Sequence, residues 1–306
     1  MRQLISRKTD IDFMGKFWFA LSLSILIGAI GIYVWISKGE DWLGVDFRGG
    51  HEVVVQLSPD ANSESIRDTI ITAGLNDAVV QAFGAGTNQY IIRLGGDSGE
   101  AEVVKKNVEQ TLKAKFPTAE ILRSDYIGPV AGEELRRNGI IAFVVSMIAL
   151  LAYLAFRFEF AFALGAVVAS LHDIIIGIGV YLMAGHALSM TALAAILTLV
   201  GYSVNDTIVI YDKVREELIK EKSYNLVDIF NRCLNEMLSR TIITGGLTLV
   251  SALALLIFGG GAISDLSLFL VVGIISGTFS TIYIACPVVI YWHRLRGGRL
   301  VVGESS

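Results

Sequence analysis

Long apolar runs separated by short polar segments make up most of the chain. Six of these runs are long enough for a helix to cross a hydrocarbon core of about 30 Å at about 1.5 Å per residue. We expect membrane-spanning helices at residues 17–36, 138–156, 160–183, 187–211, 241–258 and 266–292. Six spans place both termini on the same side of the membrane.

The pattern changes in one stretch, residues 37–137, where short alternating segments and amphipathic segments replace the apolar runs. Alternation of period two predicts strands, and apolar residues three or four apart predict helices. The expected elements lie at residues 51–57, 62–73, 78–83, 89–94, 100–116 and 118–127. Their order, β-α-β-β-α-β, is that of a ferredoxin-like domain. The predicted fold class is therefore a polytopic α-helical membrane protein with one ferredoxin-like α+β domain between spans 1 and 2.

Composition agrees with this division into spans and one polar insert. Of the 306 residues, 53% are hydrophobic and 18% are charged, and the mean hydropathy is +0.60. Such a chain is too apolar for an ordinary soluble protein, so its charges must gather outside the spans. The two cysteines, Cys233 and Cys286, both lie outside the insert, which excludes a disulfide framework there. The insert also lacks a His or Cys cluster and a nucleophile–base pair, so we expect no enzyme, metal or cofactor site.

The distribution of Lys and Arg predicts the orientation of the spans. Basic residues are frequent in three segments, residues 1–16, 212–240 and 293–306. The short loops at 184–186 and 259–265 contain no Lys or Arg. Because short loops rich in Lys and Arg stay in the cytoplasm, we expect both termini to be cytoplasmic and the insert to face the opposite side.

Polar residues inside the spans are the candidates for function. In the fourth span Thr198, Tyr202 and Asp206 follow one another at intervals of four, with Asn205 alongside, which places them on one helix face. A carboxylate in hydrocarbon costs about 3 kcal/mol or more unless it is paired, hydrated or protonated, so Asp206 is a candidate for moving protons. The alternative is that Asp206 is hydrated from the cytoplasmic end of the helix, about 9 Å away.

The fifth span opens with a second polar stripe, in which Arg240, Thr244 and Thr248 repeat the same spacing. If the two stripes meet, a carboxylate between an arginine and apolar surroundings can load and release a proton. Simpler roles remain open for these residues. Arg240 can anchor a helix end among lipid headgroups, and the threonines can bond the carbonyls of their own helix.

A second intramembrane pair, His172 and Asp173, lies midway along the third span. It is either a structural pair satisfied by Thr or Tyr side chains or a second relay position for protons. The sequence does not separate these two roles.

The predicted cytoplasmic segment 212–240 contains an amphipathic stretch at residues 225–238. Apolar side chains occupy one side of it, and Asp228, Arg232 and Glu236 occupy the other. We expect this stretch to lie flat on the bilayer surface.

One span, an external domain and five further spans resemble half of a resistance-nodulation-division type transporter. Four sequence motifs in the same order make the chain resemble, more narrowly, the SecF family of protein-export membrane subunits. The first motif follows span 1 and contains Asp46, Phe47, Gly49 and Gly50. The second precedes span 2 and contains Gly128, Pro129, Gly132 and Glu134. The third covers residues 201–206 and 211–216, and the fourth covers 239–244.

The resemblance implies a bacterial inner-membrane subunit that uses the proton-motive force, together with SecD, to help draw preproteins out of the SecYEG channel. It implies SecD, SecYEG and YajC as partners, a preprotein on the periplasmic side, and protons as the only coupling species, with no nucleic acid and no other cofactor. In that family the aspartate matching Asp206 is essential to proton transport, and Arg240 and Thr244 match residues that support it. The alternatives are a half-size proton-coupled exporter of a small molecule or lipid, and a non-conducting assembly factor.

Overall fold

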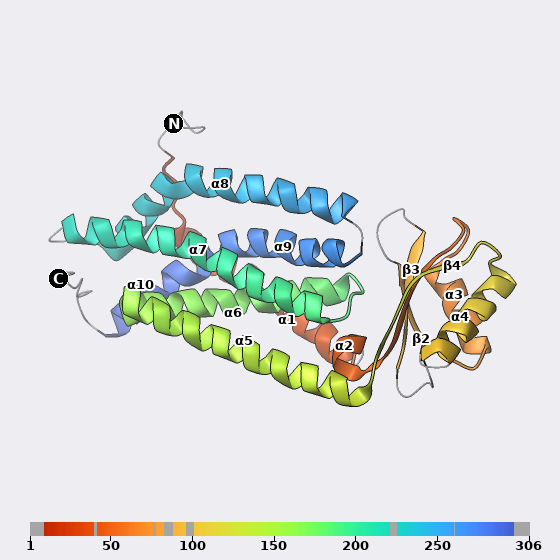
Figure 1. Cartoon of the computed structure of the whole chain (residues 1–306). Coiled ribbons are helices and arrows are strands. Elements are labelled where there is room, and N and C mark those ends of the chain that lie inside the picture. The colour runs from red at the N-terminus through yellow and green to blue at the C-terminus, as the bar shows by residue number, and fades with distance from the viewer. Residues whose placement is uncertain are drawn as a thin grey trace.

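The computed structural model describes residues 9–39, 42–75, 78–82, 88–95, 101–220, 225–259 and 261–296. The molecule is elongated (Figure 1). A bundle of long helices forms most of it, a small sheet domain lies at one end, and both chain ends lie at the other. The outermost parts of the predicted terminal segments, 1–8 and 297–306, lie outside the described residues, together with several of their basic residues. Residues 83–87, which include the last residue of the strand predicted at 78–83, lie outside them as well.

The described residues contain six helices long and apolar enough to cross a membrane, which confirms the predicted number of spans. Most are single elements: α1 (Phe17–Ser37), α5 (Pro129–Arg157), α6 (Phe160–Met183), α7 (Met190–Lys220) and α8 (Leu226–Phe258). The first is preceded by a short turn of 3₁₀ helix, Met14–Lys16. Helix α6 and the last span are about half buried, whereas α1, α5 and α8 leave most of their apolar side chains exposed at the outside of the bundle.

The last span consists of three elements. Helix α9 (Gly261–Ser280) continues through a π-helical turn, η2 (Thr281–Ala285), into α10 (Cys286–Leu295). Pro287 lies in the first turn of α10. Because proline has no N–H and its ring crowds the preceding turn, a helix must deviate locally to accept it, and a π turn is one such deviation. The single straight span predicted at 266–292 is therefore interrupted near its end.

The amphipathic stretch of 212–240 differs from the prediction. Helix α7 runs on to Lys220, and residues 226–240 belong to the same continuous helix, α8, as the fifth span. Its apolar side chains are buried in the bundle core rather than turned to a surface, namely Leu226, Ile229, Phe230, Cys233 and Leu234. Asn225 caps the helix start by accepting from the Val227 N–H, and no proline interrupts the helix before it ends at Phe258. An apolar helix face can be buried against protein or against lipid. The sequence pattern is the same in both cases, so it does not distinguish them.

The sheet domain has the predicted order of elements. Strand β1 (Gly50–Gln56) is followed by α3 (Ser63–Thr72), β2 (Ala78–Ala82), β3 (Gln89–Leu94), α4 (Ala101–Lys115) and β4 (Glu120–Ile127). All pairings are antiparallel, and the strand order is β2-β3-β1-β4, with a register shift between Val54 and Val55 where β1 meets β4. Helices α3 and α4 lie on the side of the sheet away from the bundle (Figure 1).

The domain has a core of its own between the sheet and these two helices. Alternate residues of β1, Val53 and Val55, are fully buried against Ile66 and Ile70 of α3 and Val108 of α4. This alternation is the period-two signal that predicts the strand. The domain and the bundle therefore each contain a separate hydrophobic core.

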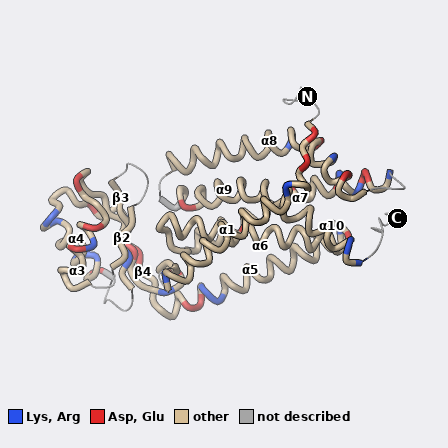
Figure 2. The backbone as a smooth tube through the Cα atoms, turned by 180° about the vertical axis from the view of Figure 1, so that it is seen from behind, with Lys and Arg blue, Asp and Glu red and all other residues tan. Residues whose placement is uncertain are grey.

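Charged residues gather in the sheet domain and at the two ends of the bundle, and the tubes between them are mostly free of charge (Figure 2). Charge concentrated at the helix ends is the distribution expected of a multi-pass membrane protein. The few charged residues between the ends therefore deserve individual explanation.

Candidate functional site

Asp206 lies on α7 with its carboxylate turned toward the start of the long apolar part of α8. Its Oδ1 accepts a hydrogen bond from Thr241 Oγ1 at 3.2 Å. Its Oδ2 is buried and has no hydrogen-bond partner among the described residues. A buried acceptor without a donor is costly, so this oxygen is the natural place for a proton to bind.

Arg240 does not pair with Asp206. Within the described residues no ion pair joins them, and the Arg240 side chain is exposed. Neighbouring residues on an α-helix point about 100° apart, so α8 can present either Arg240 or Thr241 to α7. The structure presents Thr241, which is buried.

The remaining residues of the two predicted stripes form a polar face that is open to the outside of the chain. Asn205 and Thr244 are exposed, and Tyr202 is half-buried. Thr244 Oγ1 donates to the carbonyl of Arg240 at 2.9 Å, so its hydrogen bond is satisfied within its own helix. Thr198 and Thr248 bond their own helices in the same way. The stripes therefore lie side by side on α7 and α8 and face outward, with Asp206 at their inner margin.

Charged pairs close the end of the bundle beyond this face. Arg157, the last residue of α5, donates to Asp212 of α7 at 3.0 Å. Lys213 pairs with Glu217 on its own helix at 3.1 Å and with Glu236 of α8 at 3.2 Å. These pairs lie beyond Asp206 toward the end of α7, where the first joins α5 to α7 and the pair of Lys213 with Glu236 joins α7 to α8.

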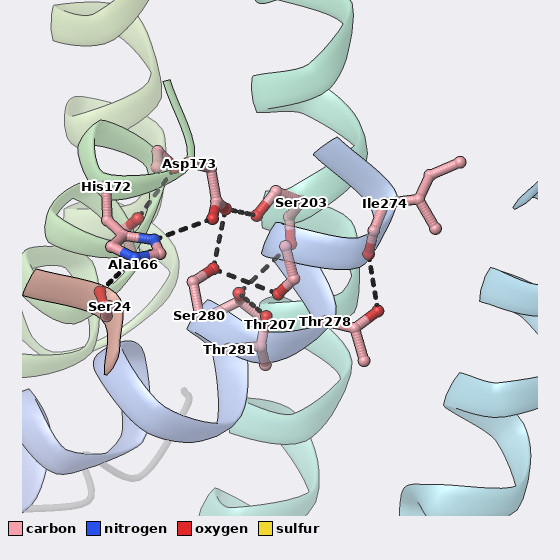
Figure 3. A network of polar contacts seen from close by, with 12 residues as sticks. Ser24, Ala166, His172, Asp173, Ser203, Thr207, Ile274, Thr278, Ser280 and Thr281 are labelled. Atoms are coloured by element: carbon pink, nitrogen blue, oxygen red, sulfur yellow. Dashed lines mark hydrogen bonds and ion pairs between the residues drawn. The ribbon is translucent and has the colours of Figure 1, made fainter. Parts of the chain in front are cut away.

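His172 and Asp173 belong to a different site (Figure 3). Asp173 is completely buried, and its Oδ2 accepts from Ser203 Oγ of α7 at 2.6 Å and from Ser280 Oγ of α9 at 2.8 Å. His172 Nδ1 lies 3.1 Å from the Asp173 Oδ1. The other ring nitrogen, Nε2, is hydrogen-bonded to Ser24 Oγ of α1 at 2.6 Å. A continuous series of hydrogen-bonded side chains therefore connects four helices, α1, α6, α7 and α9.

The first and second family motifs pack directly against each other. Gly49 has φ +75°, and a Cβ at this position would lie 2.8 Å from the Cα of Pro129. A Cβ on Gly132 would lie 2.7 Å from the Gly49 backbone nitrogen. Only glycine permits such close approach of the two backbones. Phe47 is buried beside this contact, Gly50 has φ +126° at the start of β1, and Glu134 is exposed.

Asp46 of the first motif connects the sheet domain to α7. It lies in a short helix, α2 (Val45–Arg48), and its Oδ2 accepts from the backbone N–H of Met190, the first residue of α7, at 2.7 Å. The neighbouring backbone is also bonded, from Gly44 N–H to Leu188 carbonyl and from Leu188 N–H to Trp42 carbonyl, both at 2.7 Å. Because α7 also carries Asp206, this capping contact joins the candidate site and the domain through one helix.

Four important side chains were not predicted, namely Thr241, Ser203, Ser280 and Ser24. Thr241 and Ser203 lie inside the fourth and third motifs. The usual partner of a hydroxyl residue in a membrane helix is a carbonyl of its own helix, so none of the four was expected to bond a side chain of another helix. The partners of buried carboxylates depend on which helices are neighbours, which a single sequence does not state.

Comparison with known proteins gives the family. Residues 107–295 match the family model described as protein export membrane protein SecD/SecF, C-terminal. The chain is 35% identical to the protein translocase subunit SecF of Rickettsia felis over 98% of its own length and 97% of the relative's. This chain belongs to the SecF family. The SecF of Thermodesulfovibrio yellowstonii is also 35% identical, over 92% of this chain and 95% of the relative.

Solved structures of SecDF share the fold. The crystal structure of SecDF, a translocon-associated membrane protein from Thermus thermophilus, matches with a TM-score of 0.85 and 32% identity. The match covers 95% of this chain but only 39% of that chain, so this SecF-family chain corresponds to under half of the longer protein. A structure of SecDF in a super-membrane-facing form has the same 32% identity and 95% coverage but a TM-score of 0.67.

Proposed function

We propose that this chain is an inner-membrane subunit that works with SecD to couple proton movement to the late stage of preprotein translocation. In this proposal both termini lie in the cytoplasm, the sheet domain is a ferredoxin-like domain in the periplasm, and SecYEG and YajC belong to the same assembly. The observation that carries the proposal is Asp206, a carboxylate at membrane depth with one oxygen bonded and the other buried without a hydrogen-bond partner in the described part of the chain.

Asp206 is suited to exchange a proton with its surroundings. Its bonded oxygen is fixed by one neutral hydroxyl, that of Thr241, and no ion pair joins the carboxylate to any described residue. Loss of the proton leaves a charge next to the open polar face that includes Asn205 and Tyr202. One charge moved through about 100 mV supplies about 2.3 kcal/mol. That energy shifts a two-state equilibrium by more than tenfold, which suffices for a change between two arrangements of similar energy.

The open polar face supports SecD as the partner. Asn205, Arg240 and Thr244 are exposed on this chain at a depth where the outside is either lipid or protein. An arginine facing lipid is costly, whereas a second half-bundle would cover the face and provide counter-groups. The match to only 39% of a SecDF chain is consistent with a missing second half. A partner of this kind would bring its own charged groups to Asp206 and Arg240.

Motion would reach the domain through α7. Asp206 lies in its second half, and Asp46 holds its first residue, so a shift of α7 along its axis would pull on the first motif. The lower TM-score of the super-membrane-facing SecDF form at equal identity and coverage indicates that relatives adopt more than one arrangement. We infer that the domain acts as a handle whose position follows the protonation of Asp206.

The decisive experiment replaces Asp206 with Asn in cells that depend on this chain for export. Asn keeps the size and an acceptor oxygen but cannot carry the proton. We expect release of a secreted protein from spheroplasts to fall to the level that an uncoupler produces in the unsubstituted strain. The matched control is Asp212→Asn, the same change six residues later on the same helix at an exposed position. It should leave proton-dependent release unchanged.

Membrane levels of the variant and its co-purification with SecD separate loss of coupling from loss of assembly. Normal release by a well-assembled Asp206→Asn variant would refute proton coupling at this residue and favour a non-conducting assembly factor. Normal release combined with loss of proton-linked efflux of a small molecule or lipid would favour an exporter.

A further inference from the structure

A groove of about 810 Å³ runs along the outside of the bundle at the end that carries both chain termini. Helices α1, α6 and α10 form its walls, and they contribute mainly apolar side chains, among them Leu21, Leu164, Val168 and Val288. Its size lies within the range of about 300–1,000 Å³ typical of ligand sites. The candidate proton site plays no part in it, because no residue of α7 or of the apolar half of α8 lines the groove.

The interruption of the last span shapes one wall of this groove. Tyr283 and Ile284 of the π turn and Pro287 of α10 all line it. A π turn widens the helix locally, and proline cannot continue a regular hydrogen-bond ladder. The same sequence feature that breaks the span therefore spaces α10 from α1 near their ends. The groove is built into the fold and does not result from a single side-chain rotamer.

The rim of the groove combines aromatic rings with a guanidinium group. Trp18 and Tyr291 are 74% and 65% exposed. The Trp292 ring lies 5.4 Å from the ring of Phe160 and 4.7 Å from the guanidinium of Arg296. Tryptophan and tyrosine at span ends mark the level of lipid headgroups. Arg294 lines the groove, is exposed, and forms no ion pair with any described residue.

One acidic residue, Asp12, also lies on the rim, but its carboxylate is already engaged. It accepts from the Gly15 N–H and from Asn231 Nδ2, and these two hydrogen bonds, helped by the nearby charge of Lys16, hold the pKa of Asp12 below its ordinary value. The carboxylate of Asp12 is therefore already engaged by these donors, with Lys16 as the nearby cation. Arg294 is the arginine that lines the groove and can face an incoming group.

We propose that this groove binds one anionic phospholipid, with an acyl chain along α1, α6 and α10 and the phosphate at Arg294. The groove is apolar along its length, aromatic at its rim and positively charged at its end. These three parts match, in the same order, the acyl chain, the interfacial region and the phosphate of a phospholipid. Basic pockets between membrane helices are known to hold anionic headgroups. The proposal does not depend on proton coupling, so it can fail or hold independently of the role of Asp206.

A partner helix would be the other possible occupant, but the rim argues for lipid. A helix packed in the groove would bury Arg294 in an apolar contact unless it carried a matching acid, and burying an unpaired charge is costly. A lipid phosphate pairs with the guanidinium while the headgroup stays in water. Arg294 thereby gains a counter-ion without leaving the interface.

Native mass spectrometry of the purified full chain in detergent tests the proposal, with phosphatidylglycerol and phosphatidylcholine added at equal concentration. We expect one phosphatidylglycerol to be retained in preference to phosphatidylcholine. The substitution Arg294→Gln should reduce that preference about fivefold. This factor corresponds to about 1 kcal/mol, the interaction energy of one basic residue with an anionic membrane surface. Arg136→Gln, which removes an exposed arginine at the opposite end of the bundle, should not change it.

A second variant keeps the test valid if the charge change alters the fold. Val168→Trp fills the groove without changing charge and should lower retention of both lipids, while Asp206→Asn should retain lipid normally. Equal effects of the two arginine substitutions, or full retention in Val168→Trp, would overturn the proposal. Competition by inorganic phosphate as strong as by the lipid would show an anion site only. Cross-linking of a cysteine at position 168 to a partner subunit in membranes would show a protein occupant instead.

Discussion

Two aspartates at membrane depth occupy opposite situations in this chain. Asp173 is buried and each of its oxygens is hydrogen-bonded, whereas Asp206 is half-buried and its Oδ2 has no donor among the described residues. A carboxylate with partners on both oxygens is suited to holding helices together, whereas one with an unsatisfied oxygen has room for a further partner. The difference arises from neighbours on other helices and not from the two residues themselves.

Thr241 is the residue whose removal should reveal how Asp206 is held. Thr241→Val keeps the shape but deletes the hydroxyl that donates to Asp206. We expect the free energy of unfolding in detergent to fall by about 0.6 kcal/mol, the average for such a bond between membrane helices. Proton-dependent release should fall further than this small loss explains, because the carboxylate loses its fixed orientation.

The control for this change is Thr248→Val on the same helix, where the hydroxyl only bonds the carbonyl of Thr244. It should leave release unchanged. Equal release by the two variants would mean that the hydrogen bond to Asp206 has no role in coupling.

At the residue scale the sequence indicated Asp206 but not its partner. A carboxylate in an apolar run can be recognised from the sequence alone, because carboxylates are costly in hydrocarbon and therefore rare in membrane spans. Thr241 and its neighbour Arg240 differ by one position, and which of them faces α7 depends on the rotation of α8 about its axis. Helix rotation is fixed by packing along the whole of α8, including the part that the pattern predicted to lie on the bilayer surface.

At the scale of elements, the contact between α2 and the first turns of α5 depends on glycine. Gly132→Ala places a methyl group within 2.7 Å of the Gly49 backbone nitrogen, and backbone cannot move aside as a side chain can. We expect a loss of about 1–3 kcal/mol in the free energy of unfolding from this overpacking. Thermal or chemical unfolding of the purified chain measures it.

The matched substitution is Gly201→Ala in α7, where a Cβ would meet no other atom within 4 Å. Alanine favours a helix over glycine, so this variant should be as stable as the parent or slightly more stable. Equal destabilisation by both substitutions would show that helix propensity and not the motif contact determines the effect.

The number of spans and the order of strands and helices could be predicted because each depends on local periodicity. The ends of the helices could not. Helix α5 begins at Pro129, well before the apolar run at 138, because a helix continues as long as nothing breaks it and its polar first turns lie outside the apolar part. For the π turn of the last span the sequence contained one indication, Pro287. A proline can also kink or end a helix, so its presence did not predict a π turn.

At the scale of the whole molecule, the cluster around Asp173 holds four helices in register. Asp173→Ala removes three hydrogen bonds at once, to His172, Ser203 and Ser280. At about 0.6 kcal/mol for each bond we expect a loss of about 2 kcal/mol, measured by unfolding in detergent. Asp173→Asn keeps one acceptor and should lose less.

Activity separates the two roles that the sequence left open for this pair. If the cluster is structural, Asp173→Asn retains proton-dependent release at temperatures where the variant is folded, in contrast to Asp206→Asn. Ser170→Ala is the stability control, because this buried hydroxyl only bonds the carbonyl of Ala166. Loss of release in a stable Asp173→Asn variant would instead place this aspartate on the proton route.

The contact between Asp46 and the first residue of α7 also has a consequence for biosynthesis. The two partners are 144 residues apart in the chain, and at about 5–20 residues per second the ribosome needs about 7–30 s to make the second after the first. All four strands of the sheet precede α5, so the domain can fold early, and its contact with α7 forms only after α5 and α6 have been made. The attachment of the domain to the bundle is therefore completed only when α7 arrives.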